Sequence, residues 1–146
     1  MKKLLLFSFP LLFAISFAQK NEKYVRIDFS SICCGPPSDQ PFINYLEEFR
    51  QKNKLKDFEI WLETGLGDEG EYALYIGVDR LNPKKENTFI SGIKSIVNDF
   101  ESSRNINQDG NIRFHDDLVK KDELIKKQNK RTNRYSKLVL YNPKIK

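Results

Sequence analysis

A chain of 146 residues with a formal net charge of +5 and 39% hydrophobic residues has the size of one domain with its own apolar core. After the first residues, no apolar run is long enough to span a membrane, so stable membrane insertion of the folded domain is not expected. The charge is uneven, because residues 19–112 carry 12 Lys/Arg and 16 Asp/Glu, whereas residues 113–146 carry 11 and 4. The basic segment lacks interleaved aromatic residues, which argues against a nucleic-acid partner and favours a solvated helix face over contact with an anionic surface or an acidic partner.

The first residues have the pattern of a secretory signal peptide. Lys2 and Lys3 precede an apolar run, residues 4–17, and Ser16 and Ala18 place small residues where such peptides are cut. The run is shorter than the roughly 20 residues of a membrane-spanning helix, and no cysteine follows it directly, which disfavours a retained anchor and a lipid-anchored protein. We therefore expect residues 1–18 to be removed, leaving a secreted or periplasmic single domain, residues 19–146, with a basic C-terminal extension from about residue 115.

Two segments of the first half alternate between apolar and polar residues and predict strands. They are residues 24–29 (YVRIDF) and residues 58–78 (FEIWLETGLGDEGEYALYIGV), the second being a hairpin around the glycine-rich loop 65–70. The hairpin side chains expected to face the core are Ile60, Leu62, Leu74 and Ile76. Glu59 falls on the opposite face, so its replacement by alanine is expected to change stability little.

Two helices are predicted from apolar side chains at helical spacing. The first follows the proline-rich loop 30–41 and carries Phe42, Tyr45, Leu46 and Phe49. The second starts at Asn82-Pro83 and ends near residue 103; its apolar stripe is Phe89, Ile90, Ile93, Ile96, Val97 and Phe100. Gly92 interrupts this helix at a cost of about 1 kcal/mol relative to alanine, which a close approach to the sheet or to the first helix would explain.

The last third of the chain predicts a short strand at residues 111–114, a charged helix at residues 116–131 and a strand at residues 137–141, at an edge of the sheet. The order strand, helix, strand, strand, helix, strand over residues 24–114 resembles the ferredoxin-like arrangement, in which two helices cover one face of an antiparallel sheet. We therefore predict an α+β domain of βαββαβ topology, extended by the charged helix and the edge strand. Many unrelated functions use this fold, so the fold predicts none of them.

Cys33 and Cys34 are the only cysteines, and they are adjacent in the loop before the first helix. Adjacent Cα atoms lie about 3.8 Å apart, below the usual disulfide range of about 4.4–6.8 Å, so a disulfide between them would be strained. Four states are open: one buried and one exposed thiol, a vicinal disulfide, a metal site for copper(I) or zinc, and a disulfide to another molecule. If both thiols lie close to the start of the helix, its dipole should lower their pKa.

His115, the only histidine, precedes Asp116 and Asp117. Such a run can take part in acid–base or metal chemistry, but a histidine at the end of a strand before a helix cap is the simpler interpretation. The acidic hairpin loop lacks the spacing of a calcium loop. We name no catalytic residue and no cofactor on these grounds.

Trp61 and Tyr75 share the hairpin face that points away from the expected core. Aromatic residues there indicate either a face covered by the C-terminal helix or strand, or a binding surface. Taken together, these patterns predict a small exported, non-enzymatic protein of the cell envelope or secreted fraction that binds a macromolecule or acts as an accessory module. Its partner would be another exported protein or an anionic surface. The alternatives are a thiol-based metal-binding or redox protein that uses Cys33 and Cys34, and an enzyme whose site the sequence does not reveal.

Overall fold

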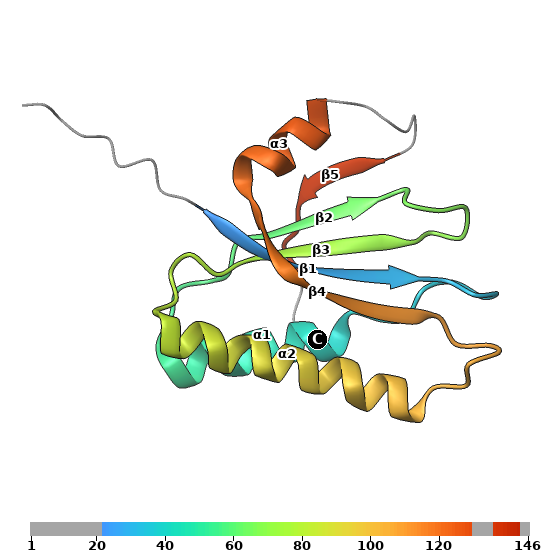
Figure 1. Ribbon diagram of the computed structural model, residues 1–146, viewed down its shortest axis with the longest axis horizontal. Coiled ribbons are helices and arrows are strands. Elements are labelled where there is room, and N and C mark those ends of the chain that lie inside the picture. Colours follow the sequence, from blue (N-terminus) through green and yellow to red (C-terminus); the bar gives the residue numbers. More distant parts are fainter. Residues whose placement is uncertain (1–21, 130–135, 144–146) are drawn as a thin grey trace, which may run out of the picture.

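In the computed structural model, residues 22–129 and 136–143 are described, and they form an α+β fold with a five-stranded antiparallel sheet and three helices (Figure 1). In chain order the elements are β1 (Lys23–Ser30), α1 (Gln40–Asn53), β2 (Ile60–Thr64), β3 (Tyr72–Gly77), α2 (Pro83–Ser103), β4 (Asn111–Lys120), α3 (Lys121–Asn129) and β5 (Lys137–Leu140). The expected signal peptide lies outside the described residues. Within the described ranges, no helix has the length and hydropathy that crossing a membrane requires.

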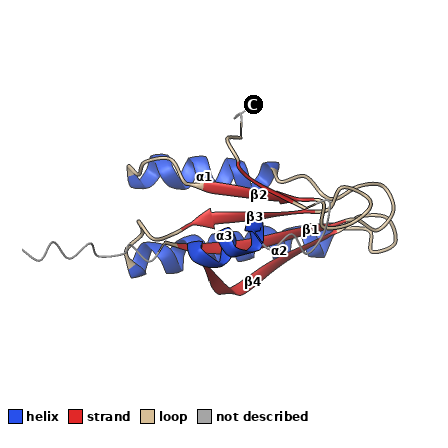
Figure 2. Cartoon of the chain, turned by 90° about the horizontal axis from the view of Figure 1, so that it is seen from above, coloured by secondary structure: helices blue, strands red, loops and turns tan. Residues whose placement is uncertain are grey.

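The sheet has the strand order β4-β1-β3-β2-β5, and every neighbouring pair is antiparallel. The position of β5 confirms the expected edge strand. Tyr72 at the start of β3 pairs with both Phe29 and Thr64, and Ser30 pairs with Asn111. The β1–α1, β2–β3 and α2–β4 connections therefore leave the sheet at the same end, where Figure 2 shows the loops gathered on the right. We call these connections, residues 31–39, 65–71 and 104–110, the loop end.

The main core lies between the sheet and the helices α1 and α2, which cover the same face (Figure 1). Phe42 and Phe49 of α1 and Phe89 of α2 are buried against the strands. The hairpin contributes Ile60, Leu74 and Ile76, which are buried, and Leu62, which is partly buried. The predicted facing of the hairpin is thus confirmed.

Gly92 of α2 lies directly beneath Tyr45 of α1. A Cβ atom at position 92 would overlap the ring and hydroxyl of Tyr45, whose hydroxyl donates a hydrogen bond of 3.1 Å to the Phe89 carbonyl. A close approach of the first helix therefore explains the glycine in the second.

The other face of the sheet carries α3, opposite α1 and α2 (Figure 1). Leu124 of α3 is 2% exposed and packs in a second cluster with Tyr24, Ala73 and Tyr75. Because Tyr24 is on β1 and the other two are on β3, this short helix covers the middle of the sheet.

The boundary between β4 and α3 differs from the prediction. The strand does not end at residue 114, and the helix does not begin at residue 116; β4 continues through Lys120. The cause is a bulge: Arg26 pairs with His115 but Tyr24 pairs with Val119, so β4 has extra residues there. The bulge breaks the alternation that marks a strand, and the charged residues around it are compatible with a helix.

Candidate functional site: the loop end

Cys33 and Cys34 lie in the β1–α1 connection, and both are exposed, free thiols. The Cys33 thiol donates a hydrogen bond of 3.3 Å to the Gln108 carbonyl in the α2–β4 connection. The hydroxyl of Ser31 accepts a hydrogen bond of 3.1 Å from the Gly35 amide and donates one to Glu69 of the hairpin loop. These contacts tie the three connections together. Because both cysteines are exposed, the structure contradicts the first of the four states, in which one thiol is buried.

The surroundings of Cys33 stabilise its protonated form. A hydrogen bond with the Cys34 thiol, partial loss of solvent and the negative charge of Cys34, Glu69 and Asp109 raise the pKa of Cys33. The helix α1 begins only at Gln40, past two prolines. The expectation that the helix dipole lowers the thiol pKa is therefore wrong for Cys33.

Cys33 and Cys34 are neighbours in the chain, both thiols are exposed, and Cys34 is among the groups that raise the pKa of Cys33. Among the residues that the structure describes, no group of three or more His, Cys, Asp and Glu side chains is placed to hold a metal ion. Structural zinc almost always has four protein ligands, so the pair alone does not fit zinc. A soft ion such as copper(I) is the metal that two thiolates favour.

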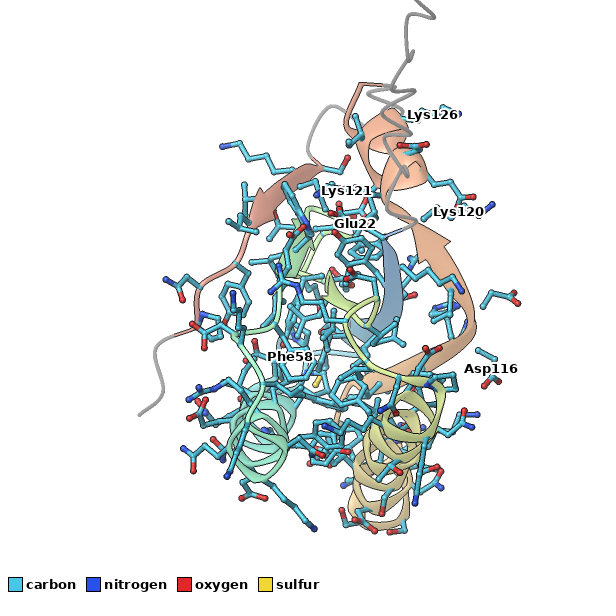
Figure 3. The ribbon with its side chains drawn as sticks, turned by 90° about the vertical axis from the view of Figure 1, so that its left-hand side faces the viewer. Glu22, Phe58, Asp116, Lys120, Lys121 and Lys126 are labelled. Atoms are coloured by element: carbon cyan, nitrogen blue, oxygen red, sulfur yellow. The ribbon has the colours of Figure 1, made fainter. Side chains whose placement is uncertain are left out.

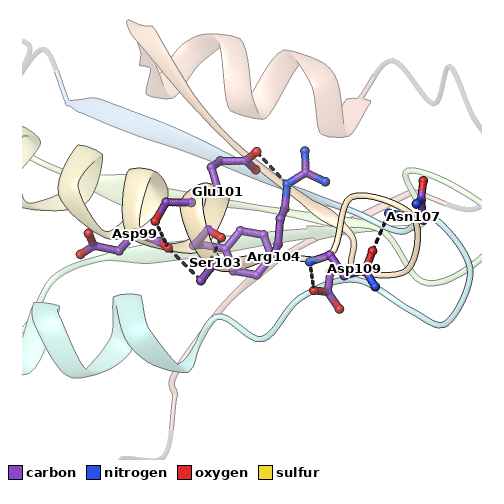
Figure 4. A network of polar contacts seen from close by, with 9 residues as sticks. Asp99, Glu101, Ser103, Arg104, Asn107 and Asp109 are labelled. Carbon is purple, nitrogen blue, oxygen red and sulfur yellow. Dashed lines mark hydrogen bonds and ion pairs between the residues drawn. The ribbon is translucent and has the colours of Figure 1, made fainter.

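The α2–β4 connection is held in shape by its own polar side chains (Figure 4). Arg104 donates from Nε to Glu101 over 2.7 Å, where α2 ends. The Asp109 carboxylate accepts a hydrogen bond of 2.6 Å from the Asn105 amide, and the Asn105 side chain accepts one of 3.1 Å from the Asn107 amide. The exposed Ile106 therefore lies in a turn that these hydrogen bonds stabilise.

Each of the three connections exposes one aliphatic side chain. Ile32 is 47% exposed in the β1–α1 connection, Leu66 is 38% exposed in the β2–β3 connection and Ile106 is 67% exposed in the α2–β4 connection. The same three connections contain five Asp and Glu residues and one arginine. The loop end therefore combines apolar side chains, two thiols and negative charge. The sequence alone does not predict that the three loops lie together, because their proximity depends on which residues of the strands pair.

Trp61 and Tyr75 do not form an open aromatic surface. Tyr75 is 0% exposed and its hydroxyl donates to Glu63, while Trp61 is half-buried and donates from Nε1 to Glu59 over 2.8 Å. Of the two sequence-based interpretations of this face, the structure favours a covered face.

Glu59, on the same face, has several partners that the sequence pattern did not indicate. Its carboxylate accepts hydrogen bonds from the Tyr24 hydroxyl (2.6 Å) and the Trp61 indole (2.8 Å), and the Lys121 ammonium lies 3.4 Å away. Lys121 also pairs with Glu22, and Figure 3 shows these two labelled residues close together. Burial acts to raise the pKa of Glu59, but the two hydrogen bonds and the Lys121 charge outweigh it and lower the pKa.

His115 lies within β4 rather than at its end, and its partner is not the neighbouring Asp116. His115 Nε2 is 2.7 Å from Asp28, whose other carboxylate oxygen accepts a 2.6 Å hydrogen bond from Arg26. Asp116 pairs with Lys94 of α2 instead. The alternation of residues 24–29 places Arg26 and Asp28 on one face of the strand. This pattern could have predicted the Arg26–Asp28 contact, but not the contact with His115.

The fold and the site thus define an α+β protein with an acidic, apolar and thiol-bearing loop end. No family model, no curated protein and no solved structure matches the chain.

Proposed function

We propose that this protein is a small exported, non-enzymatic binding or accessory module and that the loop end is its contact surface. The observation that carries the proposal is that three connections, distant in sequence, each expose one aliphatic side chain at the same end of the sheet: Ile32, Leu66 and Ile106. Apolar side chains rimmed by polar groups are typical of protein interaction sites. The acidic rim favours another exported protein that brings cationic side chains around an apolar centre.

Export is the part of the proposal supported by residues 1–18 alone. It places the domain in the periplasm or the secreted fraction, where its partner must also be found. The proposal also includes a ferredoxin-like arrangement for residues 23–120. The element order β1-α1-β2-β3-α2-β4 and the order β4-β1-β3-β2 within the sheet support this arrangement, with α3 and β5 as additions to it.

The test is co-purification from the native host with the loop end altered. The triple variant Ile32→Ser, Leu66→Ser, Ile106→Ser removes the three exposed aliphatic side chains without touching the core. The matched control is Val139→Ser, Leu140→Ser, which alters exposed aliphatic side chains of the edge strand β5. We expect a protein that accompanies the wild type and the control to be lost with the triple variant. A partner retained equally by all three proteins would contradict the proposed surface.

A thiol-based role is the second candidate, and the two exposed, free thiols at adjacent positions, Cys33 and Cys34, favour it. Two adjacent soft ligands suit copper(I). Titration with copper(I) against a chromogenic chelator should then show one ion bound, and either Cys33→Ser or Cys34→Ser should abolish the binding. Thiol counts with and without reductant would separate this from a redox role, because only an oxidised pair gains thiols on reduction.

A further inference from the structure

A second concave site lies far from the loop end, where α1 ends and α2 begins. A hollow of about 490 Å³ opens between these two helix ends. Figure 3 looks onto this part of the molecule and shows the two helices side by side. The loop end lies at the opposite end of these helices (Figure 1), so the hollow is separate from the proposed contact surface.

Three lysines line the hollow: Lys52 from α1, and Lys84 and Lys85 from α2. Within residues 22–129 and 136–143, none of the three forms an ion pair. Glu48 is the one carboxylate among the described residues of the lining. Three ammonium groups facing one carboxylate around a concavity leave a local positive potential that attracts anions.

One wall of the hollow is aromatic. Tyr45 and Phe49 line it, with their ring centroids 5.8 Å apart. Tyr45 is fixed by its hydrogen bond to the Phe89 carbonyl, and Phe49 is buried. A pocket with an apolar wall and a few charged groups fits a ligand that has an organic part and an anionic group.

We propose that this hollow binds a phosphomonoester, with the phosphate among Lys52, Lys84 and Lys85 and the organic part against Tyr45 and Phe49. A phosphomonoester carries a charge of about −1.5 to −2 near neutral pH and offers three acceptor oxygens, which matches several ammonium groups better than a single carboxylate does. The phosphate belongs to a soluble ester or to a lipid headgroup, and both present the same chemistry to the lysines.

The experiment measures binding of phenyl phosphate to the purified chain by calorimetry at low salt, with phenol and inorganic phosphate as reference probes. We expect phenyl phosphate to bind more tightly than inorganic phosphate, phenol not to bind, and affinity to fall as salt is added. Lys84→Gln, Lys85→Gln should weaken binding by about tenfold or more, as expected for the loss of charge-assisted contacts. Glu48→Gln should tighten binding, because it removes the negative charge from the rim.

The matched control is Lys120→Gln, Lys126→Gln, which removes the same charge from exposed lysines of β4 and α3. It should bind phenyl phosphate as the wild type does. No measurable binding at millimolar phenyl phosphate, or an equal loss in both double variants, would overturn the site. Vesicles of phosphatidylcholine with and without phosphatidic acid then identify the source: retention on phosphatidic acid that Lys84→Gln, Lys85→Gln abolishes indicates a lipid headgroup, and binding of the soluble ester alone indicates a free phosphomonoester.

Discussion

At the scale of single residues, a carboxylate on the sheet face opposite α1 and α2 organises the contacts between strands β1 and β2 and helix α3. Glu59 accepts hydrogen bonds from the buried Tyr24 and the half-buried Trp61 and lies next to Lys121. Periodicity correctly placed Glu59 on the face away from the main core. It could not show that two aromatic donors and one lysine converge on this carboxylate, since they come from different elements.

We therefore revise the expected effect of Glu59→Ala. Removing the acceptor leaves the Trp61 indole without its partner and the Tyr24 hydroxyl with only a longer contact of 3.4 Å to Glu22. This loss should cost about 1–3 kcal/mol of unfolding free energy in chemical denaturation. Glu48→Ala, an exposed carboxylate of α1, should change stability by less than about 0.5 kcal/mol. Equal effects of the two substitutions would mean that the contacts of Glu59 do not contribute to the free energy of unfolding.

The same carboxylate predicts a pH dependence. The pKa of Glu59 is lowered in the folded state, so its contribution is fully present above the ordinary pKa of 4.5 and is lost as the pH falls through the folded pKa. The difference in unfolding free energy between the wild type and Glu59→Gln should therefore shrink in acid. A difference that stays constant from neutral pH into acid would exclude an ionised Glu59 as its source.

For Cys33, the raised pKa predicts slow alkylation. Near neutral pH the wild-type Cys33 should react with iodoacetamide more slowly than a free cysteine, because the thiolate is the reacting species. Cys34→Ala and Glu69→Gln should each raise the rate at Cys33, since each removes a group that disfavours the thiolate. Mass spectrometry of the labelled peptide gives the rates, and alkylation faster than that of free cysteine would contradict a raised pKa at Cys33.

At the scale of elements, the contact between α1 and α2 depends on a glycine. Gly92→Ala should destabilise the wild type because its Cβ would overlap the Tyr45 ring. In a Tyr45→Ala background, the overlap is gone and the same change should stabilise by up to about 1 kcal/mol through helix propensity. A double-mutant cycle in denaturant tests this reversal of sign; the same effect in both backgrounds would rule out the contact.

The helix α3 is held to the sheet mainly by Leu124, the buried side chain of this helix among those that the structure describes. Leu124→Ala should speed amide hydrogen exchange in α3 by more than about tenfold, while exchange in α1 and α2 stays nearly unchanged. Ile125→Ala, at a more exposed position of the same helix, serves as the control. Exchange that accelerates equally throughout the molecule would show that α3 is part of the main cooperative unit.

At the scale of the whole molecule, the helices and strands could be predicted from the sequence, but the contacts between distant loops could not. Residues 24–29, the hairpin and both long helices follow clear periods of apolar residues, so their existence and facing were predictable. The predicted boundary between β4 and α3 was wrong, because the bulge near His115 interrupts the alternation of apolar and polar residues. The candidate site was predicted only as an unusual pair, Cys33 and Cys34, because the convergence of three loops on it follows from strand pairing between distant residues.

The central claim is that the loop end is the contact surface, and site-specific photocrosslinking in the native host tests it most directly. A photoreactive phenylalanine analogue is placed in turn at Ile106, at Leu66 and, as the control, at Val139 on the edge strand β5. The account predicts that positions 106 and 66 crosslink to the same partner protein and that position 139 does not. Crosslinking from position 139 with none from the loop end, or no crosslink at any of the three positions, would contradict it.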